Sequence, residues 1–345
     1  MEVNMKKGTL FLILTLGLAL SACAPRALTV MTHDSFAVSE EVIQAFEQET
    51  GIEVTFLESG DTGTALNKAI LSKDNPLADV FYGVDNTFLS RALDEDIFLR
   101  YDSPLLANIP AEFKLDTQNR ALPVDYGDVC INYDVGYFTE NNLLPPQSLE
   151  DLLKPEYKGL LVVQNPATSS PGLAFLLATI GYFGPDGYLD FWESLNANDL
   201  LVVNDWENAY YSEFSVHGGT RPMVVSYGSS PPAEVIFAET PISEPPTAAL
   251  TAKRGCFRQI EFVGILKGTR NRAQAERWID FMLSARFQED MPLQMFVYPV
   301  TRDAALPAEF EKYSSIPDET SVVSPEEIAA NREVWIKAWT EAVLR

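Results

Sequence analysis

The strongest constraint on the fold is a regular alternation of strand-like and helix-like segments along most of the chain. Strands are predicted at residues 28–36, 52–59, 78–85, 159–166 and 221–231. Helices are predicted between them at residues 40–51, 62–73 and 170–184. Alternation of this kind is typical of parallel βα units, in which helices cover both faces of a sheet. We therefore expect an α/β protein built on mainly parallel sheets.

The length of the chain and two exceptional segments favour a division into two lobes. The chain has 345 residues, of which 46% are hydrophobic, whereas a single core stops growing at roughly 250–300 residues. Strand-like runs at 124–134 and 256–266 interrupt the alternation, and we interpret them as hinge crossings between the lobes. The predicted lobes comprise residues 28–126 with 258–298, and residues 127–257 with 299–345.

Composition excludes several classes of function. The 49 acidic residues outnumber 25 basic ones, and a formal net charge of −24 disfavours nucleic acid as a partner. His33 and His217 are the only histidines, so we expect no multi-histidine metal site and no cofactor. No motif of a hydrolase, a phosphate-binding loop or a dinucleotide site is present, and we expect no enzyme. His33 beside Asp34 is the general base that an extracytoplasmic hydrolase would require.

The first residues are typical of an export signal. Lys6 and Lys7 precede an uncharged apolar run at 8–20, which is too short to span a bilayer because a spanning helix needs about 20 residues. Small residues before Cys23 resemble the bacterial lipobox, so we expect a lipoprotein signal peptide at 1–22 and a lipid anchor on Cys23. The alternative is that Cys23 stands at this position by chance and is not part of a lipobox. The mature protein is then extracytoplasmic, either at the outer face of the cytoplasmic membrane or in a periplasm.

Two further cysteines, Cys130 and Cys256, lie in the two predicted crossing strands. An exported chain is in a compartment where disulfides persist. We therefore expect a disulfide that joins the crossings near the hinge, with two independent buried thiols as the alternative.

Polar residues follow several of the predicted strands at their carboxyl ends, where open α/β sheets bind ligands. His33, Asp61, Ser169 and Ser170 lie in such segments. The two serines begin the helix at 170–184, and free N–H groups at a helix start suit an anionic oxygen. Ordinary helix capping by serine is the alternative explanation.

Aromatic side chains occur at the same kind of position. Trp206 follows the strand-like run LLVVND, and Tyr227 follows MVVS. A planar cationic ligand would gain from stacking on these rings, with Asp61 paired to an amine or ring nitrogen. Packing between the two lobes explains the two aromatic residues equally well.

The chain resembles the thiamine-binding proteins of bacterial ABC importers over nearly its whole mature length. The segments that carry the resemblance are LTVMTHDSF, ADVFYGVDN, PVDYGDVCINYD, QNPATSSPGLAFLL, NDWENAYYSEF, VVSYGSSP and YPV. The resemblance implies a fold of the periplasmic-binding-protein type, class II, in which two α/β lobes close on thiamine or its phosphates. It also implies delivery of that small molecule to an ABC permease in the membrane, and we expect the protein to be a monomer.

The resemblance assigns roles to individual residues. The acidic ligand of the family matches Asp61, the hydroxyl of its TS-x-PG tract matches Ser169, the stacking tryptophan matches Trp206, and the tyrosine of its SY pair matches Tyr227. Ser170 would assist Ser169 at the hydroxyl or phosphate end of the ligand.

The chain departs from the family pattern at several aromatic positions. His33 replaces a tyrosine, Glu40 and Phe296 replace tryptophans, and Ala233 replaces a second tyrosine of the pocket. We expect His33 and Phe296 to line the remaining wall. The changes leave a smaller pyrimidine precursor, a polyamine or ferric iron as alternative ligands. For iron, the adjacent Tyr210 and Tyr211 resemble a paired-tyrosine site, although neighbouring side chains in a helix diverge by about 100°.

Overall fold

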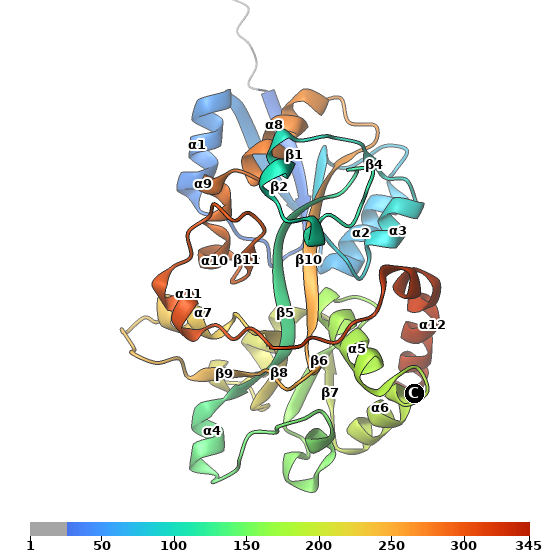
Figure 1. Cartoon of the computed structure of the whole chain (residues 1–345), viewed down its shortest axis with the longest axis vertical. Helices are drawn as coiled ribbons and strands as arrows, with labels where there is room; N and C mark the ends of the chain where they lie inside the picture. Colours follow the sequence, from blue (N-terminus) through green and yellow to red (C-terminus); the bar gives the residue numbers. More distant parts are fainter. Residues whose placement is uncertain (1–25) are drawn as a thin grey trace, which may run out of the picture.

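Two long antiparallel strands, β5 (Leu122–Asp134) and β10 (Phe257–Leu266), run side by side through the middle of the molecule (Figure 1). The structure is a computed structural model that describes residues 26–345. The predicted signal peptide at 1–22 and Cys23 lie outside the described residues. Each long strand extends from one group of helices and strands into a second group, as predicted for the crossing segments.

One group is formed mainly by the first part of the chain. Its parallel strands follow the order β2 (Ile52–Glu58), β1 (Arg26–Thr32) and β3 (Val80–Asp85), and β3 pairs antiparallel with β10. Its helices are α1 (Glu40–Thr50), α2 (Thr62–Leu71), α3 (Leu89–Asp94), α8 (Arg272–Met282), α9 (Ala285–Gln288) and α10 (Met291–Gln294). Short strands β4 (Phe98–Leu99) and β11 (Tyr298–Pro299) pair with β10 and β5.

The second group repeats the arrangement on the other side of the long strands. Its parallel strands are β8 (Met223–Tyr227), β6 (Leu161–Gln164) and β7 (Leu201–Val203), and β8 pairs antiparallel with β5. Strand β9 (Thr247–Leu250) also pairs with β5. The helices are α4 (Val135–Glu140), α5 (Ser170–Phe183), α6 (Tyr188–Ala197), α7 (Pro231–Ile236), α11 (Ala308–Tyr313) and α12 (Pro325–Val343).

The two groups share one continuous sheet, because β10 and β5 pair with each other as well as with their own neighbours. Apart from these two strands, the main strands of each group are parallel, as predicted. The architecture is therefore two-lobed and α/β, and the carboxyl ends of the parallel strands of both lobes face the region between the lobes, where ligands of such sheets bind.

The crossing strands are also joined covalently. Cys130 of β5 and Cys256, directly before β10, form a disulfide with a Cα–Cα distance of 4.5 Å. Both cysteines are fully buried. The disulfide ties the crossings together on the side of the second lobe.

Two predicted strands end earlier than expected. The prediction of a strand to Phe36 is wrong, because β1 ends at Thr32 and a turn follows in which the Phe36 N–H donates to the His33 carbonyl (3.3 Å). The prediction of a strand to Pro231 is also wrong, because β8 ends at Tyr227 and prolines at the start of α7 set a helical φ. Both corrections place polar residues in loops at the carboxyl ends of strands.

Aromatic side chains dominate the core of each lobe. Trp278 of α8 contacts Phe46 of α1 edge to face, with ring centroids 5.0 Å apart. In the second lobe, Trp192 of α6 contacts Trp339 of α12 edge to face, with ring centroids 5.5 Å apart, so the C-terminal helix packs against α6. Within the described part of the chain, no helix combines the length and the apolar character needed to cross a membrane.

Candidate ligand-binding site

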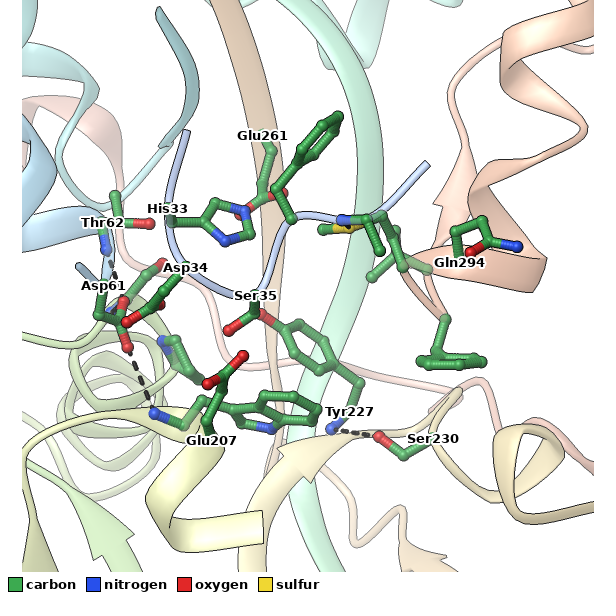
Figure 2. Close-up of a pocket in the computed structure, with 18 of the residues that line it drawn as sticks. His33, Asp34, Ser35, Asp61, Thr62, Glu207, Tyr227, Ser230, Glu261 and Gln294 are labelled. Atoms are coloured by element: carbon green, nitrogen blue, oxygen red, sulfur yellow. Dashed lines mark hydrogen bonds and ion pairs between the residues drawn. The ribbon is translucent and has the colours of Figure 1, made fainter. Parts of the chain in front are cut away.

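A cavity of about 240 Å³ lies where the strand ends of the two lobes meet. Six of the seven ligand residues predicted from the sequence line it: His33, Asp61, Ser170, Trp206, Tyr227 and Phe296. They come from the carboxyl ends of β1, β2, β7 and β8, from the start of α5 and from the loop after α10. We call this cavity the first chamber. Figure 2 shows His33 and Glu261 on one side of it and Glu207 and Tyr227 on the other.

Ser169, the seventh predicted residue, does not line the first chamber. It is the N-cap of α5 and fully buried, while the next residue, Ser170, reaches the cavity wall. The buried hydroxyls of Ser169 and Ser170 have no hydrogen-bond partner within the described chain. Of the two serines, Ser170 is therefore the one placed to meet a ligand.

The Asp61 carboxylate connects the two lobes across the first chamber. Asp61 is the N-cap of α2, and its Oδ1 accepts the N–H of Thr62 at 2.6 Å and that of Ser170 at 3.1 Å. Its Oδ2 accepts the N–H of Trp206 at 3.4 Å. Burial raises the pKa of Asp61 to about 6, although the hydrogen-bond donors and the charge of His33 oppose the rise. The carboxylate therefore still carries most of its charge at neutral pH.

A close backbone approach accompanies this contact. A Cβ on Gly63, in the first turn of α2, would lie 2.9 Å from the carbonyl oxygen of Thr168. Glycine at this position lets the start of α2 meet the loop before α5. The structure thus has the lobes in contact at one side of the cavity.

His33 lies over a cluster of buried acids. Its Nε2 is 3.6 Å from Oε1 of Glu261, and both side chains are more than nine-tenths buried. Burial alone would lower the pKa of His33, but the Glu261 carboxylate, with Asp61 and Asp125, raises it to about 9. The imidazole is therefore protonated at neutral pH and its charge is compensated inside the site.

The acids beneath His33 share a tyrosine hydroxyl. Glu261 of β10 lies directly opposite Asp125 of β5, and the Tyr82 hydroxyl is 2.7 Å from the first carboxyl and 2.6 Å from the second. A single hydroxyl proton can serve only one of them, so the other contact requires a protonated carboxyl. Burial and the charge of Glu261 raise the pKa of Asp125 well above its usual range, in keeping with a proton held within this pair of carboxyl groups.

Two glycines make room for the site rings. A Cβ on Gly83 would lie 2.4 Å from Cδ2 of His33, and a Cβ on Gly127 would lie 2.7 Å from Cδ1 of Tyr227. Each glycine is in a strand next to the ring that it accommodates. The rings can therefore lie against the backbone of β3 and β5 rather than being pushed into the chamber.

Trp206 contributes both to packing and to the chamber wall. Its indole Nε1 donates to the Ser226 hydroxyl at 3.0 Å, and its ring stacks on Tyr210 with centroids 5.0 Å apart and planes at 20°. It is half-buried and lines the first chamber. The hydroxyl of Tyr227 donates to Gln259 at 3.3 Å, which helps to hold that ring in place. The sequence left open whether Trp206 packs or contacts a ligand, and the structure allows both roles.

Several further residues line the first chamber besides the predicted ligand residues. They are Asp34, Ser35, Phe36, Ala37, Thr62, Pro171, Glu207, Tyr211, Ser230, Glu261, Gln294, Met295 and Val297. Glu261 had a sequence signal, because a carboxylate in the middle of a predicted buried strand requires a partner. Glu207 directly follows Trp206, so it could have been inferred from that position.

A second chamber of about 350 Å³ adjoins the first. Its walls are Trp206, Tyr210, Tyr211, His217, Ser230, Ala233, Glu234, Phe237, Ala238, Leu293, Gln294 and Phe296. Oε1 of Glu234 accepts the Tyr210 hydroxyl at 2.7 Å and lies 3.1 Å from Nε2 of His217. His217 is exposed and also lines this chamber. The small side chain of Ala233 leaves the space open.

The expectation that the adjacent side chains of Tyr210 and Tyr211 diverge as in an α-helix is not supported by the local structure. Tyr210 and Tyr211 lie in a π-helical turn, Asn208–Glu213, and both line the second chamber, with ring centroids 5.3 Å apart. Within the described chain, no group of three or more histidine, cysteine, aspartate or glutamate side chains is arranged to hold a metal ion.

Comparison with known proteins identifies the family. A family model described as bacterial extracellular solute-binding protein matches residues 75–323. The chain belongs to this family. Among solute-binding proteins, the thiamine-binding periplasmic protein of Salmonella typhimurium is 32% identical over 97% of this chain and 99% of its own length. That of Escherichia coli is 31% identical over 93% and 95%. The resemblance to thiamine-binding proteins found in the sequence is thereby confirmed.

Solved structures of solute-binding proteins agree with this assignment. A structure titled periplasmic thiamin binding protein superposes with a TM-score of 0.81 and 31% identity, covering 92% of this chain and 96% of the other. The ferric binding protein from Campylobacter jejuni has a TM-score of 0.74 at 20% identity, covering 91% and 99%, and so supports the fold alone. The predicted two-lobed fold of the periplasmic-binding-protein type is confirmed, and its relatives place this solute-binding protein outside the cytoplasm.

Proposed function

We propose that this solute-binding protein captures thiamine, or a closely related cationic pyrimidine, outside the cytoplasm and delivers it to an ABC permease. The observation that carries the proposal is the first chamber, which the Asp61 carboxylate lines together with Trp206 and Tyr227 from two strand ends. Aromatic faces with carboxylates suit a planar cation. The thiamine-binding relatives, at 30–32% identity over nearly the full chain, support the choice of ligand.

The roles of the site residues follow from their contacts. A carboxylate has about four acceptor positions, and three at Asp61 are used by backbone N–H groups. One position remains for an amine of the ligand. Trp206 and Tyr227 offer ring faces for stacking, while Ser170 offers an unpartnered hydroxyl at the wall. His33 and Phe296 complete the remaining wall.

The lobes that would close on the ligand are residues 28–126 with 258–298 and residues 127–257 with 299–345. Strands β5 and β10 form the hinge between them. A ligand that contacts both lobes favours the closed arrangement over the open one. Closure creates the surface that a permease recognises. No covalent step is required, so the protein acts as a binding protein and not as an enzyme.

The anchor and the state of assembly are part of the proposal. A lipid on Cys23, after removal of residues 1–22, would hold the protein beside its permease in the membrane. A monomer with one cleft is sufficient for this task, because the described chain alone supplies every wall of the chamber.

Ferric iron is the second candidate, and one observation favours it. The second chamber collects Tyr210, Tyr211, His217 and Glu234, whose oxygen and nitrogen atoms are ligands of transition metals. Thiamine has the stronger support, because the ferric binding proteins are similar to this chain at only about 20% identity.

A thermal-shift panel tests the proposal. A ligand that binds only the folded state raises Tm, and the stabilisation grows with the logarithm of the ligand concentration over Kd. We expect thiamine at 1 mM to raise Tm by several degrees, and ferric citrate and spermidine to leave it unchanged. A rise with ferric citrate alone would replace thiamine with iron as the ligand.

A further inference from the structure

The second chamber continues directly from the first. The two chambers share part of their walls, namely Trp206, Tyr211, Ser230, Gln294 and Phe296. The second chamber, at about 350 Å³, is also larger than the first, at about 240 Å³. A ligand held in the first chamber therefore has room to extend into the second.

Asp61 and the entrance to the second chamber lie at opposite ends of the first chamber. Figure 2 shows Asp61 and Thr62 on one side of the close-up, and Gln294 and Ser230, which line both chambers, on the other. A ligand whose amine meets the Asp61 carboxylate directs its far end towards Gln294 and Ser230. In thiamine, the end far from the amine is the hydroxyethyl group, so a substituent on that hydroxyl enters the second chamber.

Aromatic rings form much of the wall of the second chamber. Tyr210 stacks on Trp206, with ring centroids 5.0 Å apart and planes at 20°. Tyr211 meets these two rings edge to face at 5.5 Å and 5.3 Å. Phe237, directly after α7, lies edge to face against Phe296 at 5.4 Å. Walls of this kind suit a planar apolar group.

Two of these rings have uncovered faces. Tyr211 is 49% exposed and Phe237 is 57% exposed. A single exposed apolar side chain is ordinary at a protein surface, but these two line the same cavity. A ring bound in the second chamber would remove apolar surface of both side chains from water, which favours binding.

The polar groups of the second chamber are engaged with one another. Oε1 of Glu234 accepts the Tyr210 hydroxyl at 2.7 Å and lies 3.1 Å from Nε2 of His217. At the boundary between the chambers, the Ser230 hydroxyl lies 2.9 Å from that of Ser226. These contacts leave the aromatic faces as the main surface that the second chamber offers to a ligand.

Phe296 has an unusual backbone conformation at the point where the chambers meet. Its φ is 56°, in the left-handed region that residues other than glycine rarely adopt. Such conformations persist where the surrounding structure imposes them, and they cluster at ligand clamps. The Phe296 ring lines both chambers and contacts Phe237, so the loop that carries it shapes the passage between them.

We propose that the second chamber binds an aromatic group attached to the far end of the ligand, so that the protein accepts aromatic carboxylic esters of thiamine. The inference rests on the proposed function, because the amine at Asp61 sets the direction of the ligand. Contact with Tyr211, Phe237 and Phe296 provides the added affinity. Ala233 contributes the small side chain that leaves the space open.

Calorimetric titration of the purified protein with thiamine, O-acetylthiamine and O-benzoylthiamine tests the proposal. The acetyl ester is the matched control, because it loses the same hydroxyl proton but carries no ring. We expect the benzoyl ester to bind about threefold or more tightly than the acetyl ester. A benzoyl ester that binds no more tightly than the acetyl ester, while thiamine binds, overturns the inference and leaves the proposed function standing. Absence of heat with thiamine overturns the proposed function.

A variant that fills the second chamber tests the location of the ring. Ala233→Tyr places a large side chain at the chamber wall, and we expect the preference for the benzoyl over the acetyl ester to disappear. The matched control is Ala197→Tyr, at an exposed position of α6 outside both chambers, which should keep the preference. Loss of the preference in both variants, or in neither, places the benzoyl group elsewhere and overturns the inference.

A second variant guards against misfolding of Ala233→Tyr. Because Phe237 is more than half exposed, Phe237→Ala removes an aromatic wall without opening the core. We expect the ratio of the acetyl Kd to the benzoyl Kd to fall by about twofold or more, with thiamine affinity retained. An unchanged ratio in a folded Phe237→Ala protein contradicts the proposed contact.

Discussion

The Asp61 carboxylate accepts the backbone N–H of Ser170 at 3.1 Å, although the two residues are 109 positions apart in the chain. Asp61 begins α2 in the first lobe and Ser170 begins α5 in the second. One side chain therefore caps its own helix and holds the start of a helix across the cleft. The charge that we assign to ligand recognition is also the charge that joins the lobes.

Replacing Asp61 by asparagine removes this charge and keeps the shape of the side chain. We expect Asp61→Asn to weaken thiamine binding by about 1–3 kcal/mol, roughly five- to 150-fold in Kd, because a charge-assisted hydrogen bond is lost. Calorimetry measures the change. Asp186→Asn, at an exposed position before α6, is the control and should leave Kd unchanged. Equal Kd values for Asp61→Asn and the wild type would remove Asp61 from the site.

The indole of Trp206 presents a different test, because it both packs and lines the chamber. We expect Trp206→Ala to weaken ligand binding by about 1–3 kcal/mol, and Trp206→Phe to restore part of the loss by returning an aromatic face. Thermal unfolding of the free variants separates the two roles. If Tm falls while Kd for the ligand stays at the wild-type value, Trp206 is a packing residue only.

The protonated His33 makes stability depend on pH. Its pKa is about 9 in the folded protein and 6.5 in an unfolded chain, so the folded state holds a proton that the unfolded state releases. The resulting stabilisation is complete below pH 6.5 and is lost as pH rises towards 9. The raised pKa values of Asp61, about 6, and of Asp85, about 7, act in the same direction at lower pH.

Urea unfolding between pH 6.5 and pH 9.5 measures this effect. We expect the wild type to lose on the order of 2 kcal/mol across the window. His33→Gln removes the titrating group beside Glu261 and should lose clearly less. Parallel losses in the wild type and in His33→Gln would show that His33 does not hold the proton.

The disulfide between Cys130 and Cys256 closes a long segment of the chain, with a sequence separation of 126. Closing a long loop restricts the unfolded chain, so we expect reduction to lower the free energy of unfolding by about 2–4 kcal/mol. Ligand affinity should change little, because neither cysteine lines a chamber. The double variant in which both cysteines are alanine is the control, since reductant cannot affect it. A wild type whose unfolding is equally insensitive to reductant would contradict the prediction.

The parts of the fold that depend on local chemistry were predictable from the sequence. Helix α1, predicted at residues 40–51, ends at Thr50 with Gly51 as its cap, because Gly51 adopts a positive φ, a preference encoded in a single residue. The end of β1 was not predictable in the same way. His33 to Phe36 reads as a continuation of the strand, and the turn there is accompanied by a hydrogen bond from the N–H of Asp34 to the carbonyl of Gly60, far along the chain.

The candidate site likewise has features that the sequence predicts and features that it does not. Asp61, Trp206 and Tyr227 follow strand-like runs, so their meeting at the strand ends could be inferred from the α/β pattern. The pairing of Glu261 with Asp125 depends on the register between β10 and β5, which no local signal specifies. A π-helical turn brings Tyr210 and Tyr211 to one chamber. The prediction assumed the 3.6-residue period of an α-helix, which a π-helical turn does not follow.

Calorimetric titration of the purified protein with thiamine tests the central claim most directly. The account predicts heat of binding with one site per chain, and a Kd weakened by about 1–3 kcal/mol when the same titration is made with Asp61→Asn. A folded wild-type protein that gives no heat with thiamine, or one that gives the same isotherm after the Asp61→Asn change, would contradict it.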